Sequence, residues 1–435
     1  MQKLRLITLT CTMLCLLQAQ DGFAQTQSAQ VPENAGIFQY LLNQFSGPEN
    51  HSHVYGVIET NLQKSSDYPE GINEAGSTTY DSDAHQYNIP HAHLMLQSMK
   101  GNLFNGFLNL NINDEDGVAL NNAWMDIGLN GEALKLRLGK FYRPFGLYNE
   151  VRDSVTTRLS AQLPEYLGEN HTMISPTTNL MLHGRISGSG HTLRYAFTTG
   201  NDLRAASQTP FGTDIYYLYN NFFRFGASYY SSNGNAVAPS TEIGELKNSP
   251  VQNWMDKDKF NVYGSYMRLA HLGFNLDLEY WSSSHKAERD IEQIQALEAA
   301  TYLNPTQLQR FGLDGITGDS SASDSIPLQT NYTVSSYLMR LAYTWETEFG
   351  FVTPYINYDY YKNPETIAAK EFGGDEKAGR SQDGKFEKFS FGMIFKPIPA
   401  IAIKAEYDSN RVKFNNQSVL YSSYIMSAAY FWELN

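Results

Sequence analysis

The sequence predicts an all-β fold, a transmembrane up-and-down antiparallel β-barrel of about sixteen strands. Three observations support this prediction. Segments of about ten residues alternate apolar and polar side chains, as expected when one strand face meets lipid and the other meets water. The connections between these segments are short and long in turn. Aromatic residues make up 13% of the chain, with 29 Tyr and 24 Phe, which fits the aromatic girdles of such barrels.

The N-terminus has the pattern of a secretory signal peptide, which we assign to residues 1–24. Basic residues at the extreme N-terminus precede an apolar stretch at 6–19, which is too short to span a membrane as a helix. Small residues, Gly22 and Ala24, stand at the −3 and −1 positions of a cut after Ala24. We therefore expect a bacterial protein that is exported and becomes integral to the outer membrane.

Residues 25–50 are a polar N-terminal segment that we expect in the periplasm. Within it, Asn34–Phe45 places four apolar side chains on one helical face: Phe38, Leu41, Leu42 and Phe45. A short helix or linker before the barrel is the simpler interpretation, and a helix that plugs the pore or joins subunits is the alternative. Both cysteines, Cys11 and Cys15, precede this segment, so the mature chain has none. A closed barrel can do without disulfides because the ring pairs its backbone groups.

The barrel domain is predicted over residues 51–435, from repeated period-two alternation. In 123–129, for example, Met125 and Ile127 face away from Asp126. The predicted strands are 51–62, 89–99, 102–113, 119–130, 133–142, 178–187, 191–200, 213–220, 222–231, 260–269, 272–283, 331–346, 350–361, 385–396, 400–409 and 418–434. The last of them resembles the C-terminal strand signal that the outer-membrane assembly machinery reads.

Long and short connections take turns along the chain. The long connections are predicted at 63–88, 114–118, 143–177, 201–212, 232–259, 284–330, 362–384 and 410–417. Tight turns join the strands between them. This is the pattern of a barrel with short periplasmic turns and longer extracellular loops. In 284–330, Ile291, Ile294 and Leu297 share a helical face, which predicts a helix followed by a second short helical turn up to Phe311.

The connection 143–177 is predicted to fold inward and constrict the pore. It follows strand 133–142, in which leucines alternate with Lys135 and Arg137. It also carries acidic residues that we expect to face the basic wall of strands 133–231: Glu150, Asp153, Glu165 and Glu169. Such a transverse field orients dipolar solutes and modestly favours anions.

Inward-facing charges are predicted from the strand face opposite the apolar one. The basic pore-lining and selectivity residues, including those of the constriction loop, are Lys135, Arg137, Arg143, Arg152, Arg158, Arg185, Arg194, Arg224, Arg340, Lys388 and Lys404. The acidic pore face comprises Asp126, Asp277, Glu279, Asp359 and Glu406. An aqueous lumen keeps charges solvated, and a wall of one sign selects counter-ions. The alternative is that these charges point inward only because lipid excludes them.

The stretch Leu136–Glu150, LRLGKFYRPFGLYNE, resembles a G-[KR]-F-x-x-P-F-G segment of the phosphate-selective porin O/P-like family and related sixteen-stranded porins. Gly200-Asn201, which comes after Tyr195-Ala196-Phe197, also resembles a strand ending in that family. This resemblance implies a trimeric, passive and solute-selective pore in the outer membrane of a Gram-negative bacterium.

The predicted function is passive diffusion of small hydrophilic solutes with a modest preference for anions. We expect as partners outer-membrane lipid and lipopolysaccharide, small anionic or neutral solutes, and two further copies of the chain in a homotrimer. The formal charge of −13 argues against nucleic acid, and we expect no enzyme activity, cofactor or metal. The alternatives are a surface receptor or adhesin without conduction, or a hydrolase, for which His183 and His191 lack an evident serine and acid.

Overall fold

The computed structural model describes most of the chain after residue 49. The described residues are 50–66, 68–72, 78–81, 86–100, 103–113, 117–168, 173–175, 177–200, 209–220, 222–234, 251–299, 303, 305–311, 328–368, 374–375, 377–414 and 416–434. The predicted signal peptide and the N-terminal segment up to residue 49 lie outside these ranges. Within them, no helix combines the length and apolarity that crossing a membrane would require.

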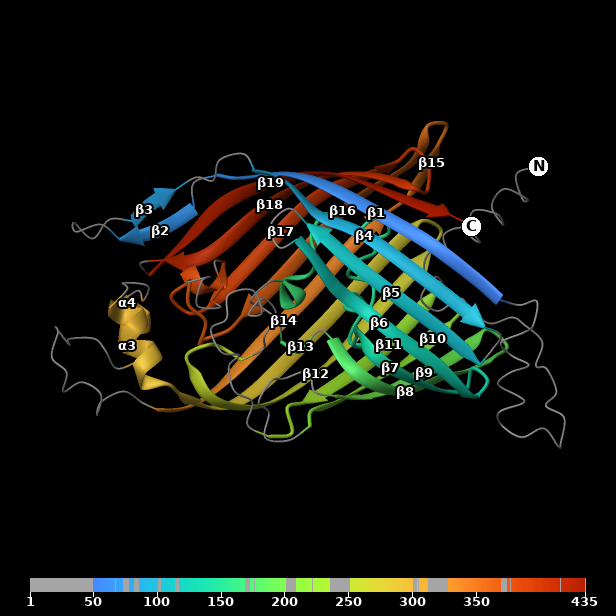
Figure 1. The fold of residues 1–435 in the computed structure, drawn as a ribbon. Helices are drawn as coiled ribbons and strands as arrows, with labels where there is room; N and C mark the ends of the chain where they lie inside the picture. The colour runs from blue at the N-terminus through green and yellow to red at the C-terminus, as the bar shows by residue number, and fades with distance from the viewer. Residues whose placement is uncertain are drawn as a thin grey trace.

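The chain forms a closed antiparallel barrel of sixteen strands (Figure 1). The barrel strands are β1 (Asn50–Ser65), β4 (Gln86–Lys100), β5 (Phe104–Asn113), β6 (Gly117–Asn130), β7 (Leu134–Tyr142), β8 (Thr177–Gly188), β9 (His191–Thr199), β10 (Phe211–Tyr219), β11 (Phe223–Ser231), β12 (Met255–His271), β13 (Phe274–Arg289), β14 (Gln329–Tyr343), β15 (Trp345–Thr347), β16 (Gly350–Lys362), β17 (Lys385–Lys396), β18 (Ile401–Phe414) and β19 (Gln417–Leu434). β14 and β15 both pair with β16 and act as one strand of the ring.

The ring closes where the first strand pairs with the last. β1 pairs with β19 on one side, Val54 opposite Leu434, and with β4 on the other, Asn50 opposite Lys100. Closure leaves no unpaired sheet edge, which a bilayer would not tolerate. The predicted fold class is therefore confirmed, and most predicted strands match the observed ones to within a few residues.

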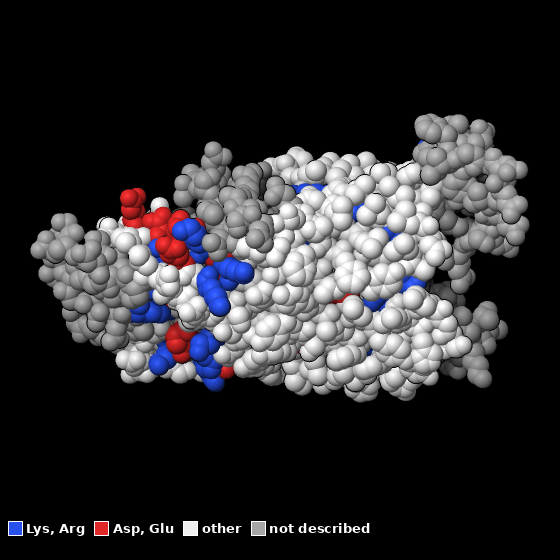
Figure 2. All heavy atoms as spheres, turned by 90° about the horizontal axis from the view of Figure 1, so that it is seen from below, with Lys and Arg blue, Asp and Glu red and all other residues white. Residues whose placement is uncertain are grey.

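The outward-facing side chains are apolar, as a lipid-facing surface requires. Ile215, Met339, Phe391 and Met393 are examples of large apolar side chains that are exposed on the outer face. Figure 2 shows a broad surface with few charges, with the largest group of charged side chains toward one end and a few small charged spots elsewhere. Exposed ion pairs at that end include Lys257 with Glu288.

The two ends of the barrel differ. At the short-turn end, tight connections such as β8–β9 and β12–β13 join neighbouring strands, and β1 begins and β19 ends there. The long-connection end carries the hairpin of β2 (Tyr68–Ile72) with β3 (Thr78–Asp81), and the helices α3 (Ile291–Ala299) and α4 (Pro305–Phe311) (Figure 1). The hairpin was not predicted from the sequence.

Two predicted connections are corrected by the structure. β18 continues to Phe414 and β19 begins at Gln417, so the last connection is a tight turn and not a long one. Asn416 takes a positive φ of 58° there, which asparagine tolerates. In the connection 284–330, β13 extends to Arg289 and a helix follows, with Ile294 and Leu297 buried. The predicted second helical turn is α4.

A large apolar cluster fills part of the barrel interior toward the long-connection end. It joins inward-facing side chains of β10 to β18 with α3, α4 and the connection between β7 and β8. Trp254, Phe260 and Trp281 are fully buried within it. The core of this protein therefore lies inside the ring, and the connection that follows β7 is part of it.

Candidate functional site: the barrel interior

Residues 143–168 and 173–175 run inside the barrel and contact strands around much of the ring. Their first turn packs on β13, where the Phe145 ring stacks on Trp281 with ring centroids 4.0 Å apart. Their short 3-10 helix, η1 (Glu165–Leu167), is fully buried on the far side of the ring, beside β16 and β17. We call residues 143–168 and 173–175 the internal loop.

Three wall carboxylates accept hydrogen bonds from backbone N–H groups of the internal loop. The Leu147 N–H donates to Glu279 Oε1 (2.6 Å), the Glu165 N–H to Asp359 Oδ2 (2.8 Å), and the Ala161 N–H to Glu406 Oε2 (3.1 Å). These carboxylates come from three different strands, so together they hold the loop across the lumen.

Buried lysines of the wall also hold the loop. Lys388 Nζ lies 2.5 Å from Glu165 Oε1, and Lys404 Nζ donates to the carbonyl oxygens of Val155 (2.5 Å) and Ser160 (3.0 Å). On β1, Glu59 lies 3.4 Å from Arg158 Nη2. These charged groups are therefore used to anchor the loop.

Tyr148 links the loop to two further wall charges. Its hydroxyl donates to Asp277 Oδ2 and accepts a hydrogen bond from Arg340 Nη1 (2.5 Å). Burial raises the pKa of the Tyr148 phenol well above its ordinary value, so the hydroxyl stays protonated and able to donate. Arg268 completes the group through a bidentate pair with Asp277 (2.6 and 2.9 Å).

Gly146 explains why the R-P-F-G part of the sequence has a glycine. Its φ is +68°, and a Cβ there would lie 2.8 Å from the Trp281 ring and 2.9 Å from the Tyr166 hydroxyl. Other residues are disfavoured both by this left-handed conformation and by the lack of space. The glycine therefore lets the loop turn against β13.

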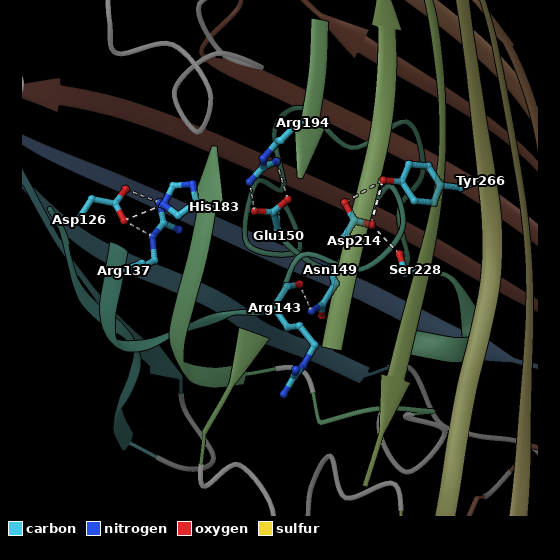
Figure 3. Close-up of polar contacts among 10 residues, drawn as sticks. All are labelled: Asp126, Arg137, Arg143, Asn149, Glu150, His183, Arg194, Asp214, Ser228 and Tyr266. Carbon is cyan, nitrogen blue, oxygen red and sulfur yellow. Dashed lines mark hydrogen bonds and ion pairs between the residues drawn. The ribbon is translucent and has the colours of Figure 1, made fainter. Parts of the chain in front are cut away.

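Figure 3 shows polar contacts of the wall from β6 to β12 and of the internal loop beside it. Asp126 forms a bidentate pair with Arg137 (2.7 Å to each nitrogen) and lies 3.2 Å from His183 Nε2. Arg194 pairs in the same way with Glu150 of the internal loop (2.8 and 2.9 Å). Planar guanidinium and carboxylate groups match in this geometry, which fixes the arginine head groups in place.

Asp214 is a second polar centre on this wall. Its carboxylate accepts hydrogen bonds from Ser228 (2.5 Å) and Tyr266 (3.0 Å), which come from the next two strands (Figure 3). Arg224 stacks over the Tyr216 ring at 3.9 Å. Within the described ranges, no group of three or more His, Cys, Asp or Glu side chains is arranged to hold a metal ion.

Arginines line up across neighbouring strands of the inner wall. Arg185 on β8 is directly opposite Arg194 on β9, and Arg224 on β11 is directly opposite Arg268 on β12. On the following strands, Arg268 is directly opposite Asp277 of β13, and Asp277 is directly opposite Arg340 of β14. We call this set the arginine row: Arg185, Arg194, Arg224, Arg268 and Arg340. Like charges this close repel, and the interleaved carboxylates Glu150 and Asp277 offset the repulsion.

The predicted basic residues fall into two groups. Arg340, Lys388 and Lys404 are buried on the wall against the internal loop, and Arg143 and Arg158 are buried residues of the loop itself. Arg143 donates to Thr198 Oγ1 (2.5 Å) and lies 4.6 Å from the Tyr230 ring centroid. The others are partly exposed: Lys135, Arg137, Arg152, Arg185, Arg194 and Arg224. Glu132, in the β6–β7 turn, pairs with both Lys135 (2.5 Å) and Arg185 (3.1 Å), and Arg152 lies over the Tyr142 ring at 5.4 Å.

The predicted acidic pore face is buried. Each of its members accepts a hydrogen bond or an ion pair, from the loop or from a wall arginine: Asp126, Asp277, Glu279, Asp359 and Glu406. Among the acidic loop residues, Glu150 meets the basic wall at Arg194 as expected. Glu165 does not, because it pairs with Lys388 and Lys377 on the other side of the ring. Asp153 contacts Asn109 and Tyr142, and Glu169 lies outside the described residues.

Arg268 was left out of the predicted basic set, although it belongs to the arginine row. Its strand, predicted over 260–269, begins earlier and has a mixed pattern, so its inward face was unclear. Tyr266 is buried two residues before Arg268. Because residues two apart in a strand face the same side, Arg268 also faces the barrel interior. The sequence also did not predict which wall residues Tyr148 and Glu165 contact, because their partners lie more than a hundred residues away in sequence.

One arrangement has the geometry of a nucleophile, a base and an acid. Ser283 Oγ lies 2.7 Å from His285 Nε2, and His285 Nδ1 lies 2.8 Å from Asp258 Oδ2. The His285 ring is stacked between Phe260 and Tyr332, and Ser283 is 0% exposed. The histidines considered from the sequence have other partners: His183 contacts Asp126, and His191 contacts Tyr217. Among the described residues, this packing leaves Ser283 closed to a substrate carbonyl.

Comparisons with known proteins place the fold among porins. No protein-family model matches the sequence, and no curated protein matches it either. The chain is similar to the solved structure of an anion-selective porin from Comamonas acidovorans, with a TM-score of 0.51 and 10% identity over 88% of this chain and 100% of that chain.

Two further solved structures are similar to a comparable degree. The outer-membrane channel DcaP of Acinetobacter baumannii gives a TM-score of 0.50 at 10% identity, over 88% of this chain and 97% of that chain. A loop-deletion mutant of OmpT, an outer-membrane protein of Vibrio cholerae, gives 0.50 at 9% identity, over 88% and 99%. At such low identity the likeness is one of fold alone, and the chain has the fold of a sixteen-stranded outer-membrane porin.

Proposed function

We propose that the protein is an outer-membrane diffusion channel for small hydrophilic solutes with a modest preference for anions. The observation that carries this proposal is the arginine row on the inner wall of a closed barrel whose outer face is apolar. Fixed guanidinium groups along a water-filled path attract anions and repel cations. The short-turn end faces the periplasm, and the signal peptide of residues 1–24 directs export.

The internal loop sets the width of the path in this proposal. It crosses the lumen and is held to β13, β16, β17 and β18 by the buried contacts described above. The basic residues it buries, such as Lys388 and Lys404, then act on solutes only through the position of the loop. The partly exposed arginines Arg185, Arg194 and Arg224 act on solutes directly.

Finer parts of the proposal come from the resemblance of residues 136–150 to the phosphate-selective porin O/P-like family. They are membership of that family and assembly as a homotrimer in lipopolysaccharide-containing outer membrane. Gly146 supports a shared loop conformation, because the glycine of this stretch is required by the packing. Cross-linking of the purified protein in detergent tests the trimer directly.

A receptor or adhesin barrel without conduction is the second candidate. It is favoured by the apolar cluster inside the ring, which joins the internal loop to α3, α4 and the strands from β10 to β18. Single-channel recording in planar bilayers decides between the two. Discrete conductance steps with a reversal potential on the anion side support the channel, and an electrically silent, folded protein supports the receptor.

A further inference from the structure

Four tight turns at the short-turn end expose large apolar side chains. They are the turns of β10–β11, β12–β13, β15–β16 and β17–β18, and the residues are Phe222 (39% exposed), Leu272 (78%), Phe349 (78%) and Ile398 (50%). Turns that face water normally carry Gly, Asn, Asp or Ser. We call these four residues the rim patch.

Leu272 is unusual in its backbone as well as in its exposure. It has a φ of +49° and is followed by Gly273 at +87°. The β8–β9 turn has nearly the same geometry, with Ser189 at +52° and Gly190 at +83°. A left-handed conformation costs a bulky side chain about 1 kcal/mol, so serine, asparagine or glycine suits this turn better than leucine does. Neither turn geometry nor burial within the barrel explains a leucine here.

The turns of the rim patch are fixed side by side. The Ala270 N–H donates to the Phe222 carbonyl (2.8 Å), and the Thr344 N–H donates to the Gly273 carbonyl (2.9 Å). The Phe222 ring also packs edge-on against His271. The four apolar side chains therefore lie on successive short turns along the rim from β10 to β18, with Glu346 and Glu348 exposed beside Phe349, whereas the β6–β7 and β8–β9 turns carry Glu132 and Ser189.

We propose that the amphipathic segment Asn34–Phe45 of the same chain docks along the rim patch. Its apolar face, predicted from the sequence, comprises Phe38, Leu41, Leu42 and Phe45. The segment precedes β1, which begins at Asn50 at the same end of the barrel as the patch. It carries no Lys, Arg, Asp or Glu, so the segment itself brings no charge that docking against the apolar side chains would bury.

The lengths agree with this docking. The linker of residues 46–49 spans at most about 14 Å when extended, and β1 is separated from β18 by two strand spacings, about 10 Å. A helix of twelve residues adds about 18 Å. Linker and helix thus reach about six strand spacings along the rim, from β1 to β13. With Phe45 near Ile398, Leu42 and Phe38 lie about 5 Å and 10 Å further along the rim, toward Phe349 on the next short turn.

The test is disulfide cross-linking of the full-length protein in native outer-membrane vesicles. The only native cysteines, Cys11 and Cys15, lie in the predicted signal peptide, so introduced pairs report without interference. The pair Leu42→Cys with Phe349→Cys is expected to form an intramolecular disulfide at least tenfold more than two control pairs. One control moves the helix cysteine to the opposite face, Asn43→Cys with Phe349→Cys. The other moves the rim cysteine to the polar turn, Leu42→Cys with Ser189→Cys.

Three outcomes overturn the proposal. Equal cross-linking of the test and control pairs shows an undocked segment, and exclusively intermolecular cross-links show that another copy occupies the patch. A cross-link from Phe349→Cys to a different protein, with none to the segment, shows an external partner.

A second readout uses the double variant Leu272→Ser with Phe349→Ser, which keeps both turns but removes two apolar side chains of the rim patch. Chymotrypsin cleavage between Phe38 and Phe45 is expected to rise several-fold, while unchanged cleavage contradicts docking.

Discussion

Glu165 and Lys388 form an ion pair in which Oε1 and Nζ are 2.5 Å apart and both side chains are 2% exposed. The first residue belongs to the internal loop and the second to β17, so this pair fixes the loop to the wall. Lys377, which is partly exposed, also approaches Glu165 at 3.0 Å. Breaking one partner of a buried ion pair typically costs about 3–5 kcal/mol, because the other charge is left uncompensated.

Lys388→Met is therefore expected to loosen the internal loop and to raise single-channel conductance and current noise. The double variant Lys388→Met with Glu165→Gln removes both charges and is expected to recover most of the quiet, wild-type behaviour. Lys257→Met, which breaks only an exposed pair with Glu288, serves as the control and leaves the conductance unchanged. Identical traces for Lys388→Met and wild type would show that the loop does not depend on this anchor.

Gly146→Ala tests the turn at the start of the internal loop. The added methyl group would lie within 3 Å of the Trp281 ring and of the Tyr166 hydroxyl, in a left-handed backbone conformation. We expect a loss of about 1–3 kcal/mol of stability, read as a lower unfolding temperature in heat-modifiability gels. Gly188→Ala is the matched control, because nothing lies within 4 Å of its added methyl group. Equal unfolding temperatures for the two variants would refute the packing argument.

Ile215→Arg tests whether the outer face meets lipid. Ile215 lies in the middle of β10 and is exposed on the outer surface. A charge at the bilayer midplane costs a barrel about 2–4 kcal/mol, so the variant is expected to unfold at lower urea concentration when refolded into lipid vesicles. Ile215→Val, which stays apolar, is the control. A barrel that accepted the arginine without loss of stability would not be embedded at this position.

Ser283 is expected to resist a fluorophosphonate probe, despite its contact with His285 and Asp258. Fluorophosphonates label serines that are activated and reachable, and Ser283 is covered by the apolar cluster. Intact-mass measurement of the folded protein should show no adduct. An adduct that Ser283→Ala abolishes would instead make the hydrolase alternative the better account of this barrel.

The alternation of side chains was enough to predict the barrel, because a lipid-facing strand must place apolar residues at every second position. Met125, Ile127 and their neighbours show this pattern directly, and the facing Asp126 is inward as predicted. The exact ends of strands were harder. β18 runs to Phe414 because its last residues still pair with β19 beyond the predicted boundary. The alternation of side chains alone does not show where a strand ends.

Contacts between the internal loop and the wall could not be predicted in the same way. The alternation of side chains along a strand shows that Lys388 and Glu406 point inward, but it does not show which residues they contact inside the barrel. Those partners, Glu165 and the Ala161 N–H, follow from the path of the loop, and that path depends on long-range packing such as Phe145 on Trp281. Glu165 was consequently expected at the basic wall of strands 133–231 and lies at β17 instead.

The reversal potential of single channels under a KCl gradient tests the central claim most directly. Wild-type protein in planar bilayers is expected to show discrete conductance and a reversal potential on the chloride side. The variant Arg185→Glu with Arg194→Glu is expected to move the reversal potential to the potassium side, because two members of the arginine row change sign. An unchanged reversal potential in that variant, with conductance intact, would contradict the account.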